Sequence, residues 1–164
     1  MSKMFSVVTL DASHSLMTEH FVPGSPDGLD ELLRDFSAIA ELPDTVAEDM
    51  LNAEADVLVE AQKATAGSML AGPYSKGITA FGLTKGKVQM SSGGKILHIT
   101  FKGTITDAHH KKPTRIAEIA FINEFGKEGQ PPRPFIKTAN EEKGDQAVQA
   151  AARIYDRFLK TKGF

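Results

Sequence analysis

The sequence contains no cysteine among its 164 residues. This absence excludes disulfide frameworks, thiolate zinc sites and cysteine nucleophiles. No apolar stretch approaches the roughly 20 residues that a membrane-spanning helix needs. The first ten residues have no basic region followed by a long apolar run, which a secretory signal would require. We therefore expect no membrane association and a protein that is made and kept in a cytoplasm.

The common catalytic fingerprints are absent as well. The sequence has no nucleophile elbow, no phosphate-binding glycine-rich loop and no His-x-x-x-His pair. Glu118 and Glu124 are too far apart on a short predicted helix to share a site. The segment 72–77 could line a cleft, but a plain loop explains its glycine and proline content better. We expect no enzymatic activity, no cofactor and no metal site.

The composition is typical of a single-domain globular protein with one hydrophobic core, since 41% of the residues are hydrophobic and 24% are charged. A chain of this length buries roughly 70% of its unfolded surface without crosslinks. Residues 1–28 are expected to form an edge strand, with Phe5, Val7, Val8 and Leu10, and then an irregular arm from Asp11 to Gly28. Residues 29–164 are expected to form a single domain.

Charge is distributed unevenly along the chain. Residues 1–60 hold 13 acidic residues against two basic ones, a net charge of −11, and residues 61–164 have a net charge of +9. Acidic helices could lie against the basic half within one monomer. Alternatively, the acidic flank of one subunit could meet the basic flank of the next in a head-to-tail ring.

Two helices are predicted in the acidic half. The first runs from about Leu29 to Glu41, with Leu29, Leu32, Leu33, Phe36 and Ile39 on one face. The second runs from about Asp44 to Ala66, with Pro43 near its start and Gly67 as its C′ residue. Its expected apolar stripe consists of Val46, Met50, Ala53, Val57, Ala61 and Ala64.

Alternating residues after Gly67 predict a small sheet. A strand containing Val88 and Met90 leads through the turn Ser91–Gly94 into a second strand whose Leu97, Ile99 and Phe101 share one face. His98 falls on the other face, so we expect it to be solvated or interfacial and not a metal ligand. Residues 67–86 and 105–113 are expected to be mobile connections that contact neighbours.

A short buried helix is predicted from Arg115 to Gly126, followed by the proline-rich link Gln130–Pro134. The link should deliver Phe135 and Ile136 into the core. Arg133 could bond carbonyls at the end of the short helix, pair with Glu124, or contact a neighbouring subunit.

The last predicted helix runs from about Thr138 to Lys160, opened by a capping box between Thr138 and Glu141 and weakened by Gly144. Its expected apolar face consists of Ala147, Val148, Ala151, Ile154, Tyr155, Phe158 and Leu159. The fold class that follows is α+β, with a small, mostly antiparallel sheet covered by a long N-terminal helix and a C-terminal helix.

Basic residues cluster beside His109 and His110, namely Lys111, Lys112 and Arg115. They could contact DNA through its phosphates, contact another subunit, or form a solvated hairpin end. A basic nucleic-acid-binding module that uses residues 109–115 is therefore the alternative function. Aromatic residues do not interleave with these lysines as a stacking platform for single strands requires.

The residues around the proline-rich link resemble a family motif. Glu124-Phe125-Gly126, followed by Pro131, Arg133, Pro134 and Phe135, is similar to the pattern of the tailed-bacteriophage tail-component family, which includes tail completion and head–tail joining (neck) proteins of long-tailed phages. The resemblance extends over residues 29–164. Pro132 departs from the family's usual alanine, Lys127 departs from its usual threonine, and residues 77–83 match only loosely.

The resemblance implies a structural protein of a phage or prophage at the head–tail junction or tail end. Subunits would assemble into a ring, with six as the expected number, and would contact head-connector and tail-tube proteins. The protein would be assembled in the bacterial cytoplasm and reside in the neck or tail of the virion.

Overall fold

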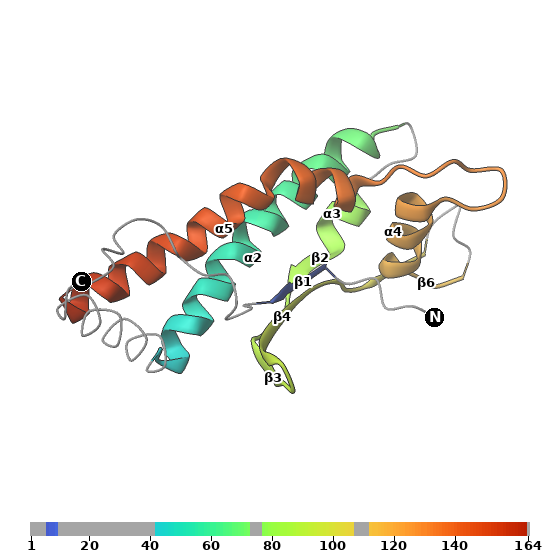
Figure 1. Ribbon diagram of the computed structural model, residues 1–164. Coiled ribbons are helices and arrows are strands. Elements are labelled where there is room, and N and C mark those ends of the chain that lie inside the picture. Colours follow the sequence, from blue (N-terminus) through green and yellow to red (C-terminus); the bar gives the residue numbers. More distant parts are fainter. Residues whose placement is uncertain (1–5, 10–41, 73–76, 107–111, 164) are drawn as a thin grey trace.

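The computed structural model describes residues 6–9, 42–72, 77–106 and 112–163 (Figure 1). Its helices are α2 (Asp44–Met69), α3 (Ile78–Gly82), α4 (Ile116–Phe125) and α5 (Phe135–Lys162). Its strands are β1 (Ser6–Thr9), β2 (Leu83–Lys85), β3 (Gln89–Ser91), β4 (Gly94–Phe101), β5 (Thr104–Ile105) and β6 (Thr114–Arg115). The expected α+β class, with a small antiparallel sheet and two long helices, is confirmed.

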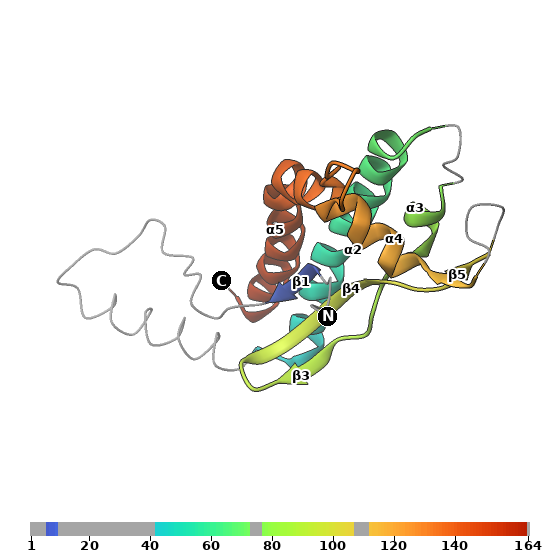
Figure 2. The same cartoon turned by 90° about the vertical axis from the view of Figure 1, so that its right-hand side faces the viewer.

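Strand β4 is the centre of the main sheet, and every pairing is antiparallel. Ile96 faces Thr9 of β1 on one side and Gln89 of β3 on the other, so β1 forms one edge while β2 and β3 share the opposite edge. The predicted hairpin is therefore correct, and so is the predicted edge strand over residues 6–9, while its expected members Phe5 and Leu10 lie outside the described residues. Strands β5 and β6 form a separate ribbon (Figure 2).

The alternation predicted along β4 is also correct. Leu97 and Ile99 are buried against Leu51, Ala55 and Leu58 of α2. His98 points to the other face and is half-buried rather than fully solvated, because β4 is flanked by strands on both sides.

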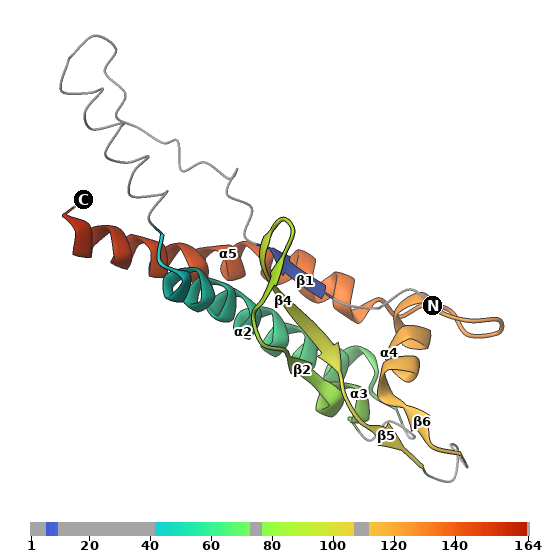
Figure 3. The same ribbon diagram turned by 90° about the horizontal axis from the view of Figure 1, so that it is seen from below.

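Helices α2 and α5 lie antiparallel along most of their length (Figures 1 and 3). The predicted apolar stripe of α2 is wrong by about one residue: Met50 is buried, but Ala64 is exposed. Because the sheet covers one side of α2 and α5 covers another, the buried surface is broad and rotated. It comprises Met50, Leu51, Ala55, Leu58, Val59, Gln62 and Ala66.

A buried polar contact joins the two long helices. The amide nitrogen of Gln62, whose side chain is inaccessible to solvent, donates to Oδ1 of Asn140 over 2.8 Å. A buried amide without its partner costs about 1–3 kcal/mol, so this contact penalises sliding of α5 along α2.

Two predicted helix boundaries are wrong. Helix α2 continues through Gly67 to Met69, and α5 begins at Phe135 rather than Thr138. Thr138 consequently lies inside the first turn, where its hydroxyl donates to the carbonyl of Pro134 over 2.8 Å instead of forming a capping box. Two further predictions are wrong. Val148, which was expected on the apolar face of α5, is exposed. Helix α3 and strand β2 occupy part of the segment 67–86, which was expected to be a mobile connection.

Some predictions fall on residues outside the described part of the chain, namely the arm 11–28, the helix 29–41 and residues 107–111 of the basic loop. Among the helices that the structure describes, none is long and apolar enough to cross a membrane.

Gly82 permits the close approach of α3 to α4. A Cβ atom there would lie 2.6 Å from Cγ2 of Ile116 and 2.9 Å from the carbonyl oxygen of Lys102. We predict that Gly82→Ala destabilises the fold by about 1–3 kcal/mol because the core has no room for a methyl group. Gly144→Ala, in open space on α5, should instead stabilise it by about 0.5–1 kcal/mol. Urea unfolding of both variants measures the two changes in the free energy of unfolding. Equal changes would contradict the close packing around Gly82.

Candidate functional site

The residues that carry the family resemblance form the joint between α4 and α5. Helix α4 ends at Gly126, whose φ of 78° lies in the region that favours glycine and whose amide donates to the carbonyl of Ile122 over 2.8 Å. A Cβ atom on Gly126 would lie 2.8 Å from the carbonyl oxygen of Gln130. Glycine is therefore required, because the following chain folds back over this position.

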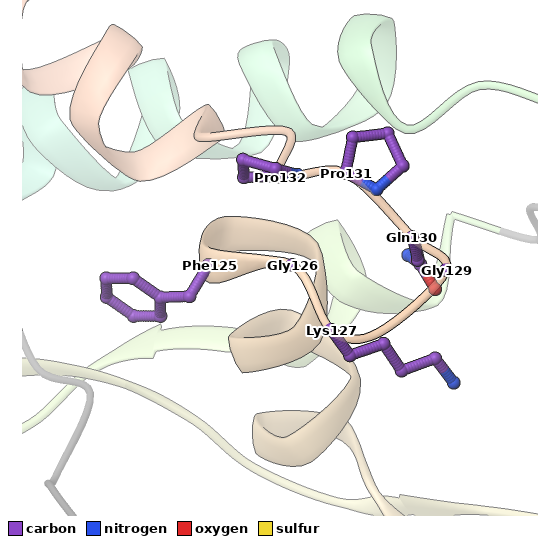
Figure 4. Close-up of a pocket in the computed structure, with 7 residues that line it drawn as sticks. All are labelled: Phe125, Gly126, Lys127, Gly129, Gln130, Pro131 and Pro132. Carbon is purple, nitrogen blue, oxygen red and sulfur yellow. The ribbon is translucent and has the colours of Figure 1, made fainter.

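The chain reverses in a tight turn after Gly126. Lys127 and Gln130 exchange backbone hydrogen bonds of 3.0 and 2.9 Å, which direct residues 131–134 back past α4 (Figure 4). The three prolines of this link have no N–H to leave unpaired, so it needs no strand partner. The predicted short helix and extended link are both present, but the expected burial of the helix is wrong, since only Ile116, Ala120, Asn123 and Glu124 of α4 are buried.

Glu124 caps helix α5. The residue is 7% exposed, and its carboxylate accepts hydrogen bonds from the backbone amides of Ile136 (2.8 Å) and Lys137 (3.0 Å). These amides are among the N-terminal donors of α5 that have no partner within the helix. A carboxylate there also interacts favourably with the positive end of the helix dipole. Helix α4 thus supplies the N-terminal cap of α5 from twelve positions upstream.

The remaining amides at the start of α5 are also satisfied. Pro134, the N-cap residue, has no N–H, and its φ of −78° and ψ of 69° form an inverse γ-turn in which the amide of Phe135 donates to the carbonyl of Arg133 over 2.8 Å. The turn delivers the ring of Phe135 into the core, where it is inaccessible and meets Phe101 edge to face at 6.1 Å. The prediction for Phe135 is confirmed; Ile136 packs at the core edge.

Arg133 binds Asn123 and not Glu124. Its Nη2 donates to Oδ1 of Asn123 over 2.6 Å, and its backbone amide donates to the carbonyl of Asn123 over 2.6 Å. The guanidinium therefore bonds a side-chain oxygen at the end of α4 and not the backbone carbonyls predicted for it, since the carbonyl of Asn123 accepts from the Arg133 main chain. The predicted pairing with Glu124 is also wrong, because that carboxylate is occupied by α5. A contact of Arg133 with a neighbouring subunit stays a prediction.

Sequence reasoning missed Asn123, which connects the joint. Its amide nitrogen donates to the carbonyl of Ile119 over 2.9 Å while its side-chain oxygen accepts from Arg133. The available signal was a polar residue on the buried side of an otherwise apolar helix. Together, Asn123, Glu124 and Arg133 form a hydrogen-bonded latch that fixes α4 against the start of α5.

The apolar members of the motif lie outside the latch. Phe125 is 60% exposed, and Pro131 and Pro132 are exposed. With Gly126, Lys127, Gly129 and Gln130 they line an open pocket of about 470 Å³ (Figure 4). Phe121, also missed from sequence, is 41% exposed and packs its ring against that of Phe125, with centroids 4.8 Å apart. We call Phe121 and Phe125 the aromatic face of α4.

The second predicted set of residues is only partly placed. Lys112 and Arg115 are exposed beside the β5–β6 ribbon, and Lys111 lies outside the described residues. Within the described ranges, no group of three or more histidine, aspartate and glutamate side chains is arranged to hold a metal ion.

Comparisons with protein-family models, curated proteins and solved structures found no match for this chain.

We predict that Glu124→Ala lowers the free energy of unfolding by about 1–3 kcal/mol, because two amides at the buried start of α5 lose their acceptor. Glu124→Gln retains one acceptor oxygen and should lose less. Glu128→Ala, on the exposed turn nearby, is the control and should change the free energy by less than about 0.5 kcal/mol. Urea unfolding at one protein concentration gives the comparison, and equal stability of all variants would contradict the capping role.

Proposed function

We propose that this chain is a structural protein of a tailed bacteriophage or prophage. It acts at the head–tail junction or tail end, where it assembles into a ring and contacts head-connector and tail-tube proteins. The proposal rests on the resemblance of the 124–135 motif to tail completion and head–tail joining proteins, and on how the structure distributes the side chains of that motif.

The observation that carries the proposal is the division of the motif into two parts. Its polar groups, on Glu124 and Arg133, are engaged in hydrogen bonds within the chain. A carboxylate that caps a helix is not offered to a substrate. Its exposed members are apolar, Phe125 and Pro131. A rigid joint that presents aromatic and proline side chains suits protein contact better than catalysis.

The latch explains why such a contact would be well defined. An exposed aromatic side chain on a mobile loop loses conformational entropy when a partner binds. Here the exposed Phe125 stands on a helix whose last turn is hydrogen-bonded to Arg133 of the link through Asn123 and to α5 through Glu124. The contact surface is therefore fixed before the partner arrives, as repeated identical contacts in a ring require.

We predict that the purified protein forms closed rings of about six subunits, as the family resemblance implies. Light scattering after size exclusion, over a range of protein and salt concentrations, measures the mass, and negative-stain images of the same fractions show the shape. Rings that loosen with salt would support a contact between acidic and basic flanks. A strict monomer under all conditions would argue against self-assembly.

A second candidate function, DNA contact, is favoured by the exposure of Lys112 and Arg115 at the β5–β6 ribbon. Exposed cations at a loop can neutralise phosphates without disturbing the fold. Replacing Lys111, Lys112 and Arg115 with alanine should then weaken DNA binding at low salt. Replacing Arg157, Lys160 and Lys162, at the exposed end of α5, removes the same charge and is the control.

A fluorescence titration with duplex DNA at several salt concentrations distinguishes the two triple variants. Equal affinity of both variants and the unchanged protein would exclude a specific role of the 111–115 cluster. A selective loss that becomes smaller as salt rises would support it.

A further inference from the structure

The described residues leave the aromatic face of α4 open to solvent, with Phe121 41% and Phe125 60% exposed. The rings of Phe121 and Phe125 pack on each other at the surface, and Phe125 lines the pocket with Lys127 and Pro131. Side chains of this size bury enough apolar area to dominate the energy of an interface. A second segment of the chain carries apolar side chains that need a surface to cover them.

That segment is residues 29–41. The sequence predicts a helix there with five large apolar side chains on one face, which requires a surface to bury it. The surrounding segment 10–41 carries seven acidic residues and one basic residue, Arg34. It is therefore an acidic segment with a single apolar face.

Both ends of the segment 10–41 are anchored at the same end of the molecule. On one side, Thr9 pairs with Ile96 of β4. On the other, Nζ of Lys95 contacts Glu48 at 2.8 Å and Asp44 at 3.1 Å, which ties β4 to the first turns of α2. The hydrogen bond to Glu48 is the main contact that raises the pKa of Lys95. The segment thus leaves and re-enters the described structure beside the start of α2.

The aromatic face lies at the other end. Ala120 of α4 packs with Ala66 and Leu70 at the end of α2 (Figures 1 and 3). From Leu42 to Ala66 the axis of α2 advances about 36 Å, at 1.5 Å per residue. A helix over residues 29–41 is about 20 Å long and is joined directly to Leu42. A helix of that length is too short to span from Leu42 to α4 of its own chain, so the predicted helix would meet the α4 of a second copy.

We propose that the apolar face of residues 29–41 of one copy docks on the Phe121–Phe125 face of the next copy. The interface is head to tail. Each subunit presents the apolar face of its acidic segment at one end and the aromatic face of α4 at the other. Repetition of such a contact closes into a ring when the rotation per subunit allows it. Lys127 in the pocket wall supplies a cation that suits an acidic occupant. This inference rests on the proposed ring and names the contact that forms it.

Two full-length variants test the contact. Phe36→Asp places a charge on the apolar face of the segment, and Phe125→Asp places one on the aromatic face. Each variant alone should give single subunits, because every contact in the ring then has one defective side. An equimolar mixture should give a one-to-one dimer with about twice the subunit mass and no ring, because only one productive pairing remains. Light scattering after size exclusion measures both.

Matched controls separate the contact from general effects of an added charge. Ala38→Asp lies on the opposite side of the predicted helix, and Phe81→Asp replaces an exposed phenylalanine (89%) on α3. Both should form rings like the unchanged protein. Thermal unfolding checks that Phe125→Asp folds, and Phe121→Ser, a milder change on the same face, should also reduce the ring fraction.

Failure of the contact can be distinguished from failure of the ring. If the unchanged protein forms rings and the Phe36 and Phe125 variants form them equally well, this contact is wrong and the ring proposal stands. If the unchanged protein stays monomeric, both are wrong. If Phe36→Asp lowers the melting temperature of the subunit and the mixture gives no dimer, the segment packs within its own chain and the contact is overturned.

Discussion

The hydrogen bonds between the Glu124 carboxylate and the first amides of α5 are the constraint on which the arrangement of this protein depends. They join a ten-residue helix to a helix of 28 residues that lies along α2 (Figure 1). Because a charged acceptor pairs with donors that have no other partner, the direction in which α5 starts is set by the position of α4. The orientation of α5 in turn decides where Phe135 enters the core and how α5 lies along α2.

The same constraint separates the buried and exposed parts of the motif. The side-chain polar groups of Asn123, Glu124 and Arg133 make their hydrogen bonds inside the joint. The loop between Glu124 and Arg133 is therefore held at both ends. Phe125 is adjacent to Glu124 in sequence and therefore points away from the cap, toward solvent. A latch that stabilises the fold consequently also determines the position of the side chains that we propose for assembly.

The two ends of the molecule differ in structure, and this difference suits a repeated head-to-tail contact. At one end, Lys95 holds the β3–β4 hairpin to the start of α2, close to where the acidic segment 10–41 joins the described structure. At the other end lie α4, whose last residue Phe125 lines the pocket, and the β5–β6 ribbon (Figures 1 and 3). The paired helices between them, with the buried Gln62–Asn140 contact, keep the two ends at a constant distance. A ring of identical subunits needs such a rigid spacing.

The sequence by itself determined the elements whose signals are local: the second long helix, the β3–β4 hairpin with its Ser92-Gly93 turn, the short helix closed by Gly126 and the proline-rich link. Hydrophobic period, glycine and proline act over a few residues, so no distant partner is needed to interpret them. The tertiary structure alone decided which face of α2 is buried, because that depends on the sheet and α5 together. It also decided that Arg133 binds Asn123 and that Glu124 caps α5, whereas a local capping box had been expected at Thr138. A buried carboxylate goes to the donors that most need an acceptor, and their position is known only after the chain has folded back on itself.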